Sequence, residues 1–259
     1  MNTGTSPHCI EHSTWDEVER RIAGGAAAIL PIGAAAKEHG FHLPMNTDRV
    51  QAEWLAAHLA ERIDALIWPT LTYGHYPAFT AYAGSTSLPA PLFEAMVREI
   101  ATGILAQGCR ALLVLDTGLS TIAPVARALA GLDLALHLRI HEGARYRDAA
   151  RRLTTQSRGS HADELETSLM LALAPGLVDM SRAEASPLAT GTAPGPLTPS
   201  DTASPNYSHS GSYGDPTLAT RAKGEILLAA MTDDIGEQAV AFLESIAGDS
   251  RKPVRSLSR

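Results

Sequence analysis

The chain has 259 residues, 45% of them hydrophobic and 19% charged, and this length allows roughly 70–75% of the unfolded surface to be buried without a stabilising metal or disulfide. Its formal net charge of −7 disfavours a nucleic-acid partner, since phosphate binding requires a clustered basic surface. No apolar run approaches the ~20 residues of a membrane span, which disfavours a membrane partner.

The first 14 residues form a polar N-terminal tail without the apolar core of a signal peptide. The chain has only two cysteines, Cys9 in this tail and Cys109 before an apolar run, which argues against a disulfide framework. Both features predict a cytoplasmic protein in a reducing compartment. We expect residues 15–247 to form a single domain, followed by a C-terminal tail at 248–259.

Short apolar runs alternate with segments of helical spacing. The expected strands are 26–33, 65–69, 111–115 and, more weakly, 132–138, and the expected helices between them are 48–63, 91–107 and 121–130. The first three strands show no strict polar alternation, which is typical of strands covered on both faces. The pattern predicts an α/β fold with a mainly parallel sheet and helices on both faces.

In such a sheet the ligand crevice lies beyond the carboxyl ends of the strands. This rule selects residues 33–48, 73–87 and 116–121 as candidate pocket segments.

The second half of the chain has a different pattern. A helix is expected at 160–173, with Ser160 as its N-cap, and another at 217–246. Between them, residues 181–216 are rich in Pro, Ser, Thr and Gly and are too long for an idle connection. We expect this late loop to pack over the pocket or across a subunit interface and to place one of three residues near the active site: Tyr207, His209 or Tyr213.

The densest cluster of ionisable residues lies in the first pocket segment. It comprises Lys37, Glu38, His39, His42 and Asp48. Imidazole and carboxylate together suit Zn²⁺, Mn²⁺ or Fe²⁺, and His39 and Asp48 could meet at one ion if the loop folds back. Alternatively, Asp48 could cap its helix with Gln51 completing a variant of the capping box, and His42 could be a hydrogen-bonded loop residue.

A second cluster opens the helix expected at 160–173. His161, Glu164 and Ser168 share one face at three- and four-residue spacing, whereas Glu166 is expected to point elsewhere. Histidine beside acids at a helix start could be a proton shuttle or a ligand set. Equally, the acids could simply favour the helix dipole.

Two further segments offer polar groups to a pocket. The loop after the second strand contains His75, Ser85 and Thr86, and the third strand ends at Asp116 and Thr117. Such residues can bind substrate, although an ordinary surface loop is an equally good reading. The chain has neither a phosphate-binding loop nor a Gly-x-Ser-x-Gly elbow.

Several ordered blocks together resemble the creatininase (creatinine amidohydrolase) family. Residues 30–33 (Leu-Pro-Ile-Gly), His39-Gly40, His42-Leu43-Pro44 and Asp48 resemble its first signature, in which Glu-x-His-Gly-x-His precedes a later Asp. Further matching blocks are Tyr73-Gly74, Gly84-Ser85-Thr86, the stretch from His161 to Ser168, and residues 214–220. The blocks extend from about residue 25 to 230.

The resemblance implies a metal-dependent α/β hydrolase of carbon–nitrogen bonds in amides, often a homo-oligomer. Its two ions would be held by the Glu, His and Asp of the signature and by a His and a carboxylate of a later loop. Here Lys37 stands at the Glu, Gly118 at the later His and Ser120 at the later carboxylate. An ammonium about 4 Å from a dication is a strong electrostatic conflict.

We therefore expect a hydrolase of a small-molecule amide or cyclic amide, outside peptide bonds, with at most one divalent ion. His39 and Asp48 would be its ligands, with Glu38, His42 and Glu166 as candidates for a third. His161 or Glu164 would carry a proton to the leaving nitrogen. A metal-free variant uses Lys37 to stabilise an oxyanion and Glu38 or Asp48 as base. The alternative is a non-catalytic ligand-binding or assembly protein with a degenerate site.

Overall fold

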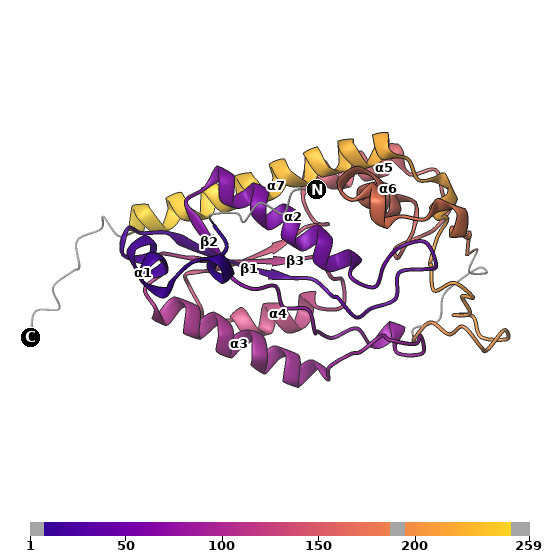
Figure 1. Ribbon diagram of the computed structural model, residues 1–259, viewed down its shortest axis with the longest axis horizontal. Coiled ribbons are helices and arrows are strands. Elements are labelled where there is room, and N and C mark those ends of the chain that lie inside the picture. The colour runs from indigo at the N-terminus through magenta and orange to yellow at the C-terminus, as the bar shows by residue number, and fades with distance from the viewer. Residues whose placement is uncertain (1–7, 187–194, 250–259) are drawn as a thin grey trace, which may run out of the picture.

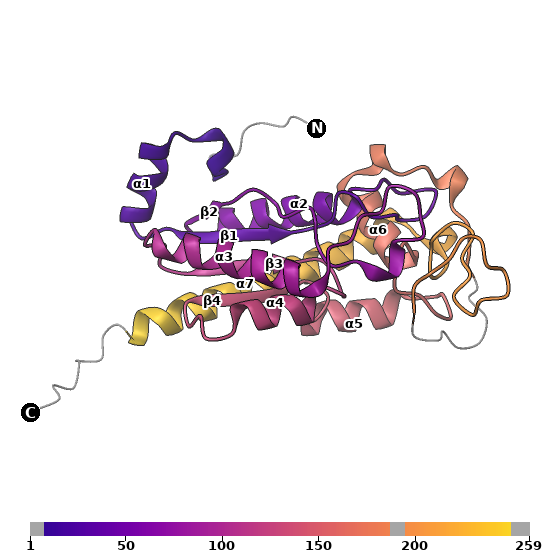
Figure 2. The ribbon, with the colours of Figure 1, turned by 90° about the horizontal axis from the view of Figure 1, so that it is seen from below.

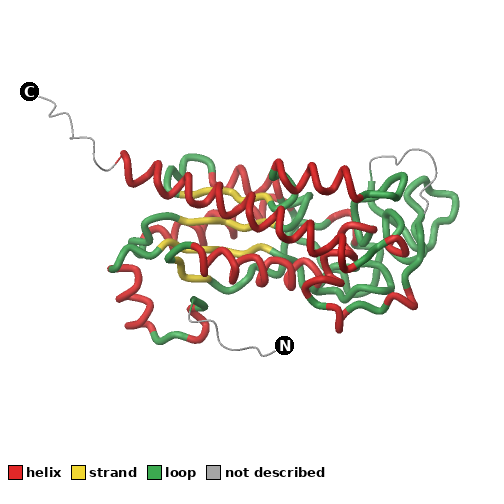
Figure 3. The backbone as a smooth tube through the Cα atoms, turned by 90° about the horizontal axis from the view of Figure 1, so that it is seen from above, coloured by secondary structure: helices red, strands yellow, loops and turns green. Residues whose placement is uncertain are grey.

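The computed structural model describes residues 8–186 and 195–249. A four-stranded, fully parallel sheet with the strand order β2-β1-β3-β4 forms its centre (Figure 1; Figure 3). The strands are β1 (Ala27–Ile32), β2 (Ala65–Ile67), β3 (Leu112–Asp116) and β4 (Ala135–Arg139). Ile29 of β1 pairs with Ile67 on one side and with Leu113 on the other. The predicted α/β fold with a parallel sheet is confirmed.

Helices cover both faces of this sheet. In chain order they are α1 (Trp15–Ala23), α2 (Thr47–Arg62), α3 (Ala90–Ala106), α4 (Ile122–Leu129), α5 (Ala144–Leu153), α6 (Glu164–Leu173) and α7 (Arg221–Asp249). In Figure 1, α2 and α7 lie above the sheet with α5 and α6, and α3 and α4 lie below it. Within the described ranges, none of the helices combines the length and apolar character that crossing a membrane requires.

The sheet separates two hydrophobic cores. One contains Ile29 and Leu113 with residues of α2, α5, α6 and α7, and the other contains Leu30 and Val114 with residues of α3 and α4. Successive residues of a strand point to opposite faces, so neighbours such as Ile29 and Leu30 belong to different cores. The unbroken apolar character of the strands therefore reflects burial on both sides.

Two helices were not predicted. Helix α1 carries only a short amphipathic pattern and buries no residue, and Figure 2 shows it lying apart from the sheet. Helix α5 has four arginines among its ten residues, and only Tyr146 and Ala149 are buried. The helices were predicted from the spacing of apolar residues. Helices that bury so few side chains carry too weak an apolar pattern to be recognised in this way.

The helix expected from Ser160 begins four residues later than predicted. The backbone of Ser160 and His161 forms a bridge with Tyr213, in which the Tyr213 N–H donates to the His161 carbonyl at 2.8 Å. This contact holds the chain extended, and Asp163 then caps α6 by accepting hydrogen bonds from two backbone N–H groups. The prediction of Ser160 as N-cap was therefore wrong.

The site lies where the carboxyl ends of the strands meet α6 and the late loop, at the right-hand end of Figure 1. Gly33 ends β1 and allows the chain to fold back on α2, because a Cβ atom there would lie only 2.5 Å from the Asp48 carbonyl oxygen. Helix α2 follows Asn46, and Asp48 lies in its first turn without capping it. The capping interpretation of Asp48 is thus wrong, and its carboxylate is available to the site.

Candidate active site

A pocket of about 360 Å³ lies at this end of the sheet. Segments distant in sequence form its walls: the loop after β1, the segment around Phe79, the loop after β3, the start of α5 and the start of α6. Its ionisable lining residues are Lys37, Asp48, His141, Tyr146, His161, Asp163 and Glu166. The pocket therefore occupies the crevice expected from the parallel sheet.

Lys37 and Asp48 form a buried ion pair on one wall of the pocket. Lys37 Nζ lies 2.7 Å from Asp48 Oδ2, and the two side chains are 8% and 3% exposed. Burial alone would lower the pKa of Lys37, but the Asp48 and Glu166 carboxylates outweigh it and raise the pKa above its ordinary value. Burial alone would raise the pKa of Asp48, but Lys37 and then His39 hold it well below its usual range. Both groups are therefore charged at neutral pH.

Aromatic rings cover this ion pair. Lys37 Nζ lies 5.0 Å from the ring centroid of Phe79 and 5.7 Å from that of Tyr76. Both distances fall within the range of a cation–π contact. The rings favour the charged amine and limit the access of water to it.

His39 lies directly behind the ion pair and is completely buried. Its Nδ1 donates to the Lys37 carbonyl oxygen at 2.9 Å, and its Nε2 lies 3.1 Å from Asp48 Oδ1. Both contacts belong to one loop and the adjoining helix turn. The predicted approach of His39 and Asp48 is present, although the second oxygen of Asp48 faces an ammonium.

His161 contacts the same loop from the other side. Its Nε2 donates to the Glu38 carbonyl oxygen at 2.9 Å and to Glu38 Oε1 at 2.7 Å. The other carboxylate oxygen of Glu38 accepts from the Gly40 backbone at 2.9 Å. Burial would raise the pKa of Glu38, but the hydrogen bond from His161 outweighs it and lowers the pKa. Glu38 thus orients His161 and does not line the pocket.

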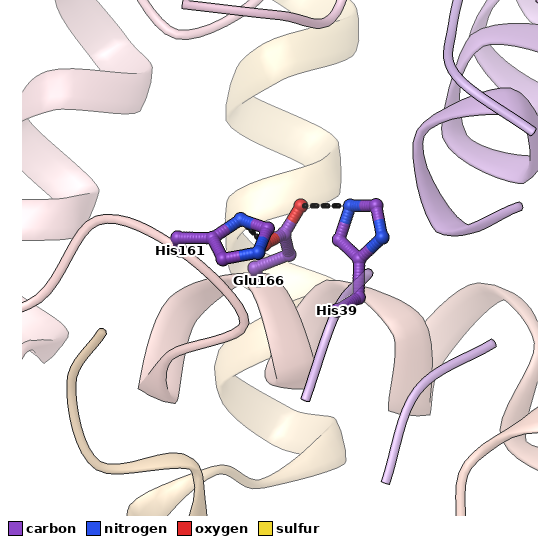
Figure 4. A group of neighbouring side chains, drawn as sticks. All are labelled: His39, His161 and Glu166. Atoms are coloured by element: carbon purple, nitrogen blue, oxygen red, sulfur yellow. Dashed lines mark ion pairs between the residues drawn. The ribbon is translucent and has the colours of Figure 1, made fainter. Parts of the chain in front are cut away.

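Glu166 completes the centre of the site (Figure 4). Its Oε1 lies 3.8 Å from His39 Nε2, and its Oε2 lies 3.8 Å from His161 Nδ1. One donor atom from each of these three residues lies within 4.8 Å of the others, a spacing that could hold a metal ion. Burial would raise the pKa of Glu166, but His39 and His161 outweigh it and lower the pKa.

The expectation that Glu166 points away from the site was wrong. It assumed a helix starting at Ser160, in which His161 and Glu164 would share a face. Because α6 starts only at Glu164, His161 lies outside the helix and its neighbour across the site is Glu166. When the predicted start of a helix is wrong by about one turn, the residues before the true start do not share a face with those inside the helix.

Glu164 does not line the pocket. Its carboxylate accepts hydrogen bonds from the backbone N–H groups of Thr155 and Gln156 and forms an ion pair with Lys223. The side chain is buried, and the hydrogen bonds that outweigh the burial lower its pKa. This geometry gives Glu164 a structural role, tying α6 to the preceding segment and to α7.

Most of the residues predicted to bind substrate lie outside the pocket lining. His42 donates to or accepts from Thr167 Oγ1 at 2.8 Å, and burial lowers its pKa to about 4. His75 contacts the Leu88 carbonyl oxygen, and Ser85 Oγ accepts from the Glu38 backbone at 2.9 Å. Thr86 is exposed. These residues stabilise the loops around the site.

Of the two residues predicted at the end of β3, one lines the pocket and the other does not. Asp116 is buried, and its carboxylate accepts from Gly118 N–H, from Thr121 Oγ1 and from His137. It shapes the loop that follows, whereas Thr117 lines the pocket together with Gly118 and Ser120. Of the six predicted substrate-binding residues, only Thr117 therefore reaches the pocket.

The late loop packs against the site, as far as the structure describes it. Residues 187–194 of the predicted 181–216 segment lie outside the described residues. Gly211 (φ +94°) lies against the Glu38 carboxylate, and Tyr82 donates its hydroxyl to the Ser208 carbonyl oxygen at 2.7 Å. Tyr213 bridges His161 through its backbone. The loop thus buttresses the Glu38–His161 contact. Its described residues are absent from the pocket lining, and of the three residues predicted near the active site, Tyr213 contacts His161, whereas Tyr207 bridges Thr198 and His209 contacts Glu184.

Sequence reasoning missed His141, Tyr146 and Phe79. His141 follows β4, and its Nε2 donates to the Thr117 carbonyl oxygen at 3.2 Å, while its Nδ1 lies 3.3 Å from the Tyr146 hydroxyl. Burial raises the pKa of Tyr146. The strand-end rule could have found His141, because β4 is the fourth strand of the same sheet and ends two residues earlier.

Comparisons with known proteins agree with this architecture. A family model described as creatinine amidohydrolase matches residues 11–239. The chain is 30% identical over 250 residues to the creatinine amidohydrolase of Pseudomonas putida, covering 86% of this chain and 93% of the relative. It is 31% identical over 220 residues to the mycofactocin precursor peptide peptidase of Mycobacterium tuberculosis, covering 80% and 81% of the two chains.

A solved structure described as "Creatininase Mn" superimposes with a TM-score of 0.78 at 27% identity, covering 90% of this chain and 98% of that one. The family model spans all the residues that line the pocket. The chain therefore belongs to the creatininase family of hydrolases.

Proposed function

We propose that this protein hydrolyses a carbon–nitrogen bond in an amide or cyclic amide of a small molecule. The observation that carries the proposal is the buried Lys37–Asp48 ion pair on the wall of a 360 Å³ pocket. A pocket of this size lies at the small end of the range for ligand sites, about 300–1,000 Å³. It favours a compact substrate over an extended peptide.

Lys37 provides a fixed positive charge for the transition state. Attack on an amide carbonyl places negative charge on its oxygen, and a preorganised donor in a water-poor site stabilises that charge. The ammonium is held by Asp48 at 2.7 Å and covered by Phe79 at 5.0 Å. It therefore needs little reorganisation when the charge develops.

Asp48 and His141 position the reacting groups in this proposal. Asp48 is ionised and lines the pocket, and it orients the attacking water by accepting a hydrogen bond from it. His141 lines the pocket and bonds to both Thr117 and Tyr146, which hold its ring against the substrate. Glu164, which does not line the pocket, takes no part.

The residues present fit at most one divalent ion. Two imidazoles and one carboxylate converge within 4.8 Å at His39, His161 and Glu166. A second ion does not fit, because Lys37 occupies one oxygen of Asp48, and Gly118 and Ser120 offer neither imidazole nor carboxylate. A single bound Zn²⁺, Mn²⁺ or Fe²⁺ would polarise the carbonyl and lower the pKa of a bound water.

The experiment is a hydrolysis screen of the purified full chain. Small amides, cyclic amides and short peptides are incubated with and without added Mn²⁺ or Zn²⁺, and products are identified by mass spectrometry. We expect release of an amine from a small amide and loss of turnover in the paired variant Lys37→Met with Asp48→Asn. Binding of small amides without turnover would favour the ligand-binding alternative, and turnover of peptides alone would overturn the substrate class.

We also propose, from the family resemblance, that the protein assembles as a homo-oligomer and, from its polar N-terminal tail and few cysteines, that it acts in the cytoplasm. Light scattering of the purified chain checks the first statement, and a mass equal to the 27.4 kDa chain would contradict it. Fractionation of cells that produce the protein checks the second.

A further inference from the structure

We propose that His39, His161 and Glu166 together form the ligand set of one divalent transition-metal ion, in place of the His39–Asp48 set suggested by the sequence. The three residues come from the loop after β1, from the segment before α6 and from α6 itself (Figure 4). One donor atom from each lies within 4.8 Å of the others. The ion would lie at the pocket of the proposed function. Only its role in hydrolysis rests on that function, whereas its binding does not.

The hydrogen bonds of His39 leave one ring nitrogen for an ion. Nδ1 lies 2.9 Å from the Lys37 carbonyl oxygen, and because a carbonyl can only accept, Nδ1 carries a proton. In the neutral ring, Nε2 then presents a lone pair to Asp48 Oδ1 at 3.1 Å and to Glu166 Oε1 at 3.8 Å. A divalent ion between these three atoms would accept a lone pair from each of them.

The hydrogen bonds of His161 also leave one of its ring nitrogens for an ion, on the opposite side of Glu166. Nε2 faces two acceptors of Glu38, the carbonyl oxygen and Oε1, so it is the protonated nitrogen. Nδ1 is left with its lone pair and faces Glu166 Oε2 at 3.8 Å. Histidine ligands of metals usually donate their other N–H to a carbonyl or a carboxylate, and both His39 and His161 follow that rule.

Two N–H donors, one from the backbone and one from a side chain, hold the Glu166 carboxylate between these two rings. The Ala162 N–H donates to Oε2 at 2.7 Å, and Gln51 Nε2 donates to Oε1 at 3.3 Å. Ala162 adopts a φ of +46°, a region that residues other than glycine rarely occupy. Strain of this kind is typical of functional sites, where the surrounding structure enforces it. The three donor atoms lie within 4.8 Å of one another and would move closer on binding, since ligands of a tetrahedral zinc lie about 3.3 Å apart.

Asp48 is excluded from the set by Lys37, whose ammonium already neutralises it at 2.7 Å. Two imidazoles and one carboxylate then give the three protein ligands that a catalytic zinc-like ion needs. His161 and Glu166 line the pocket, so an ion held by this set would lie beside the space where substrate and water enter. The set of two nitrogens and one oxygen suits Zn²⁺, Mn²⁺ or Fe²⁺.

The test is metal binding to the chelator-treated full chain, with Co²⁺ as the probe. Calorimetry and visible absorption measure affinity and stoichiometry. We expect one equivalent of Co²⁺, displaced by Zn²⁺. His161→Ala and Glu166→Gln should each weaken binding at least about 100-fold, since loss of a mere second-shell partner already costs about 10–100-fold. The paired variant Lys37→Met with Asp48→Asn should still bind, as should His58→Gln, which alters a histidine stacked on Trp54 of α2.

X-ray absorption of the unmodified, zinc-loaded protein gives a second measurement that needs no variant. Two imidazole nitrogens in the first coordination shell are expected, and only one would overturn the assignment. So would two equivalents of metal, no binding by the folded protein, or binding that survives loss of His161 and Glu166 but not of Asp48. Neither measurement depends on turnover, so a chain that hydrolyses amides but binds no metal at these residues would overturn this inference and leave the proposed function standing. A chain that binds the ion but hydrolyses no amide would overturn the proposed function alone.

Discussion

The Nζ atom of Lys37 lies 2.7 Å from Oδ2 of Asp48, and less than a tenth of either side chain is exposed. Removing one member of such a pair leaves an uncompensated charge in a poorly hydrated place. We predict that Lys37→Met lowers the free energy of unfolding by about 3–5 kcal/mol, whereas the pair Lys37→Met with Asp48→Asn costs far less. Urea unfolding measures both. Equal losses in the single and paired variants would show that the ion pair is not what stabilises this loop.

A second prediction follows from the charge of Lys37. Lys37→Glu replaces the ammonium by a carboxylate beside Asp48, so two acids then share a buried site and repel one another. The variant should unfold at a lower temperature without metal, and added Mn²⁺ or Zn²⁺ should restore its stability. Elemental analysis should show more bound metal than in the unmodified protein, because the new carboxylate favours uptake of a second ion.

Lys37→Met serves as the matched control, because it removes the cation without adding a ligand. A metal content unchanged by Lys37→Glu would mean that the loop cannot accommodate a second ion whatever its charge.

A third prediction concerns pH. His42 binds a proton near pH 6.5 in the unfolded chain, whereas burial lowers its pKa to about 4 in the folded protein. Between these values the unfolded state binds more protons, so the free energy of unfolding falls as the pH decreases from about 6.5 to about 4. The loss amounts to about 3 kcal/mol for the full difference.

Denaturant unfolding in chelator at several pH values measures this loss. In His42→Gln the decrease between pH 6.5 and 4 should become shallower. The buried acids, such as Glu38, whose pKa is lowered, contribute mainly below this window. A pH profile identical in His42→Gln and the unmodified protein would contradict the assignment.

A fourth prediction tests the late loop. A side chain at Gly211 would collide with the Glu38 carboxylate, and its φ of +94° disfavours any other residue. Gly211→Ala should therefore displace Glu38 from His161 and reduce turnover by more than the strain alone explains. Gly25→Ala is the matched control, since Gly25 has a similar φ of +88° and no neighbouring atom within 4 Å. If both variants lose the same stability and keep the same turnover, the loop does not shape the site.

The sheet was predictable because burial on both faces leaves a mark on every residue of a strand. The apolar runs around Ile29 and Leu113 needed no knowledge of their neighbours to be recognised as strands. The carboxyl-end rule then placed the pocket, and it would have placed His141 as well had it been applied to the fourth strand.

The arrangement inside the site was less predictable, because distant contacts decide it. Tyr213 holds His161 in extended backbone across 52 residues of sequence, which delays α6 and turns Glu166 toward the pocket and Glu164 toward the segment before α6. Local spacing assigned these two acids the wrong way round. No helical periodicity could have revealed a contact that lies outside the helix.

The position of Lys37 has a consequence for how the site depends on its surroundings. A bound metal ion has a dissociation constant, so its occupancy follows the supply of metal in the cell and the strength of competing chelators. The ammonium of Lys37 is part of the polypeptide, and it stands beside Asp48 in every folded copy. Metal starvation would therefore leave one positive charge of this pocket in place.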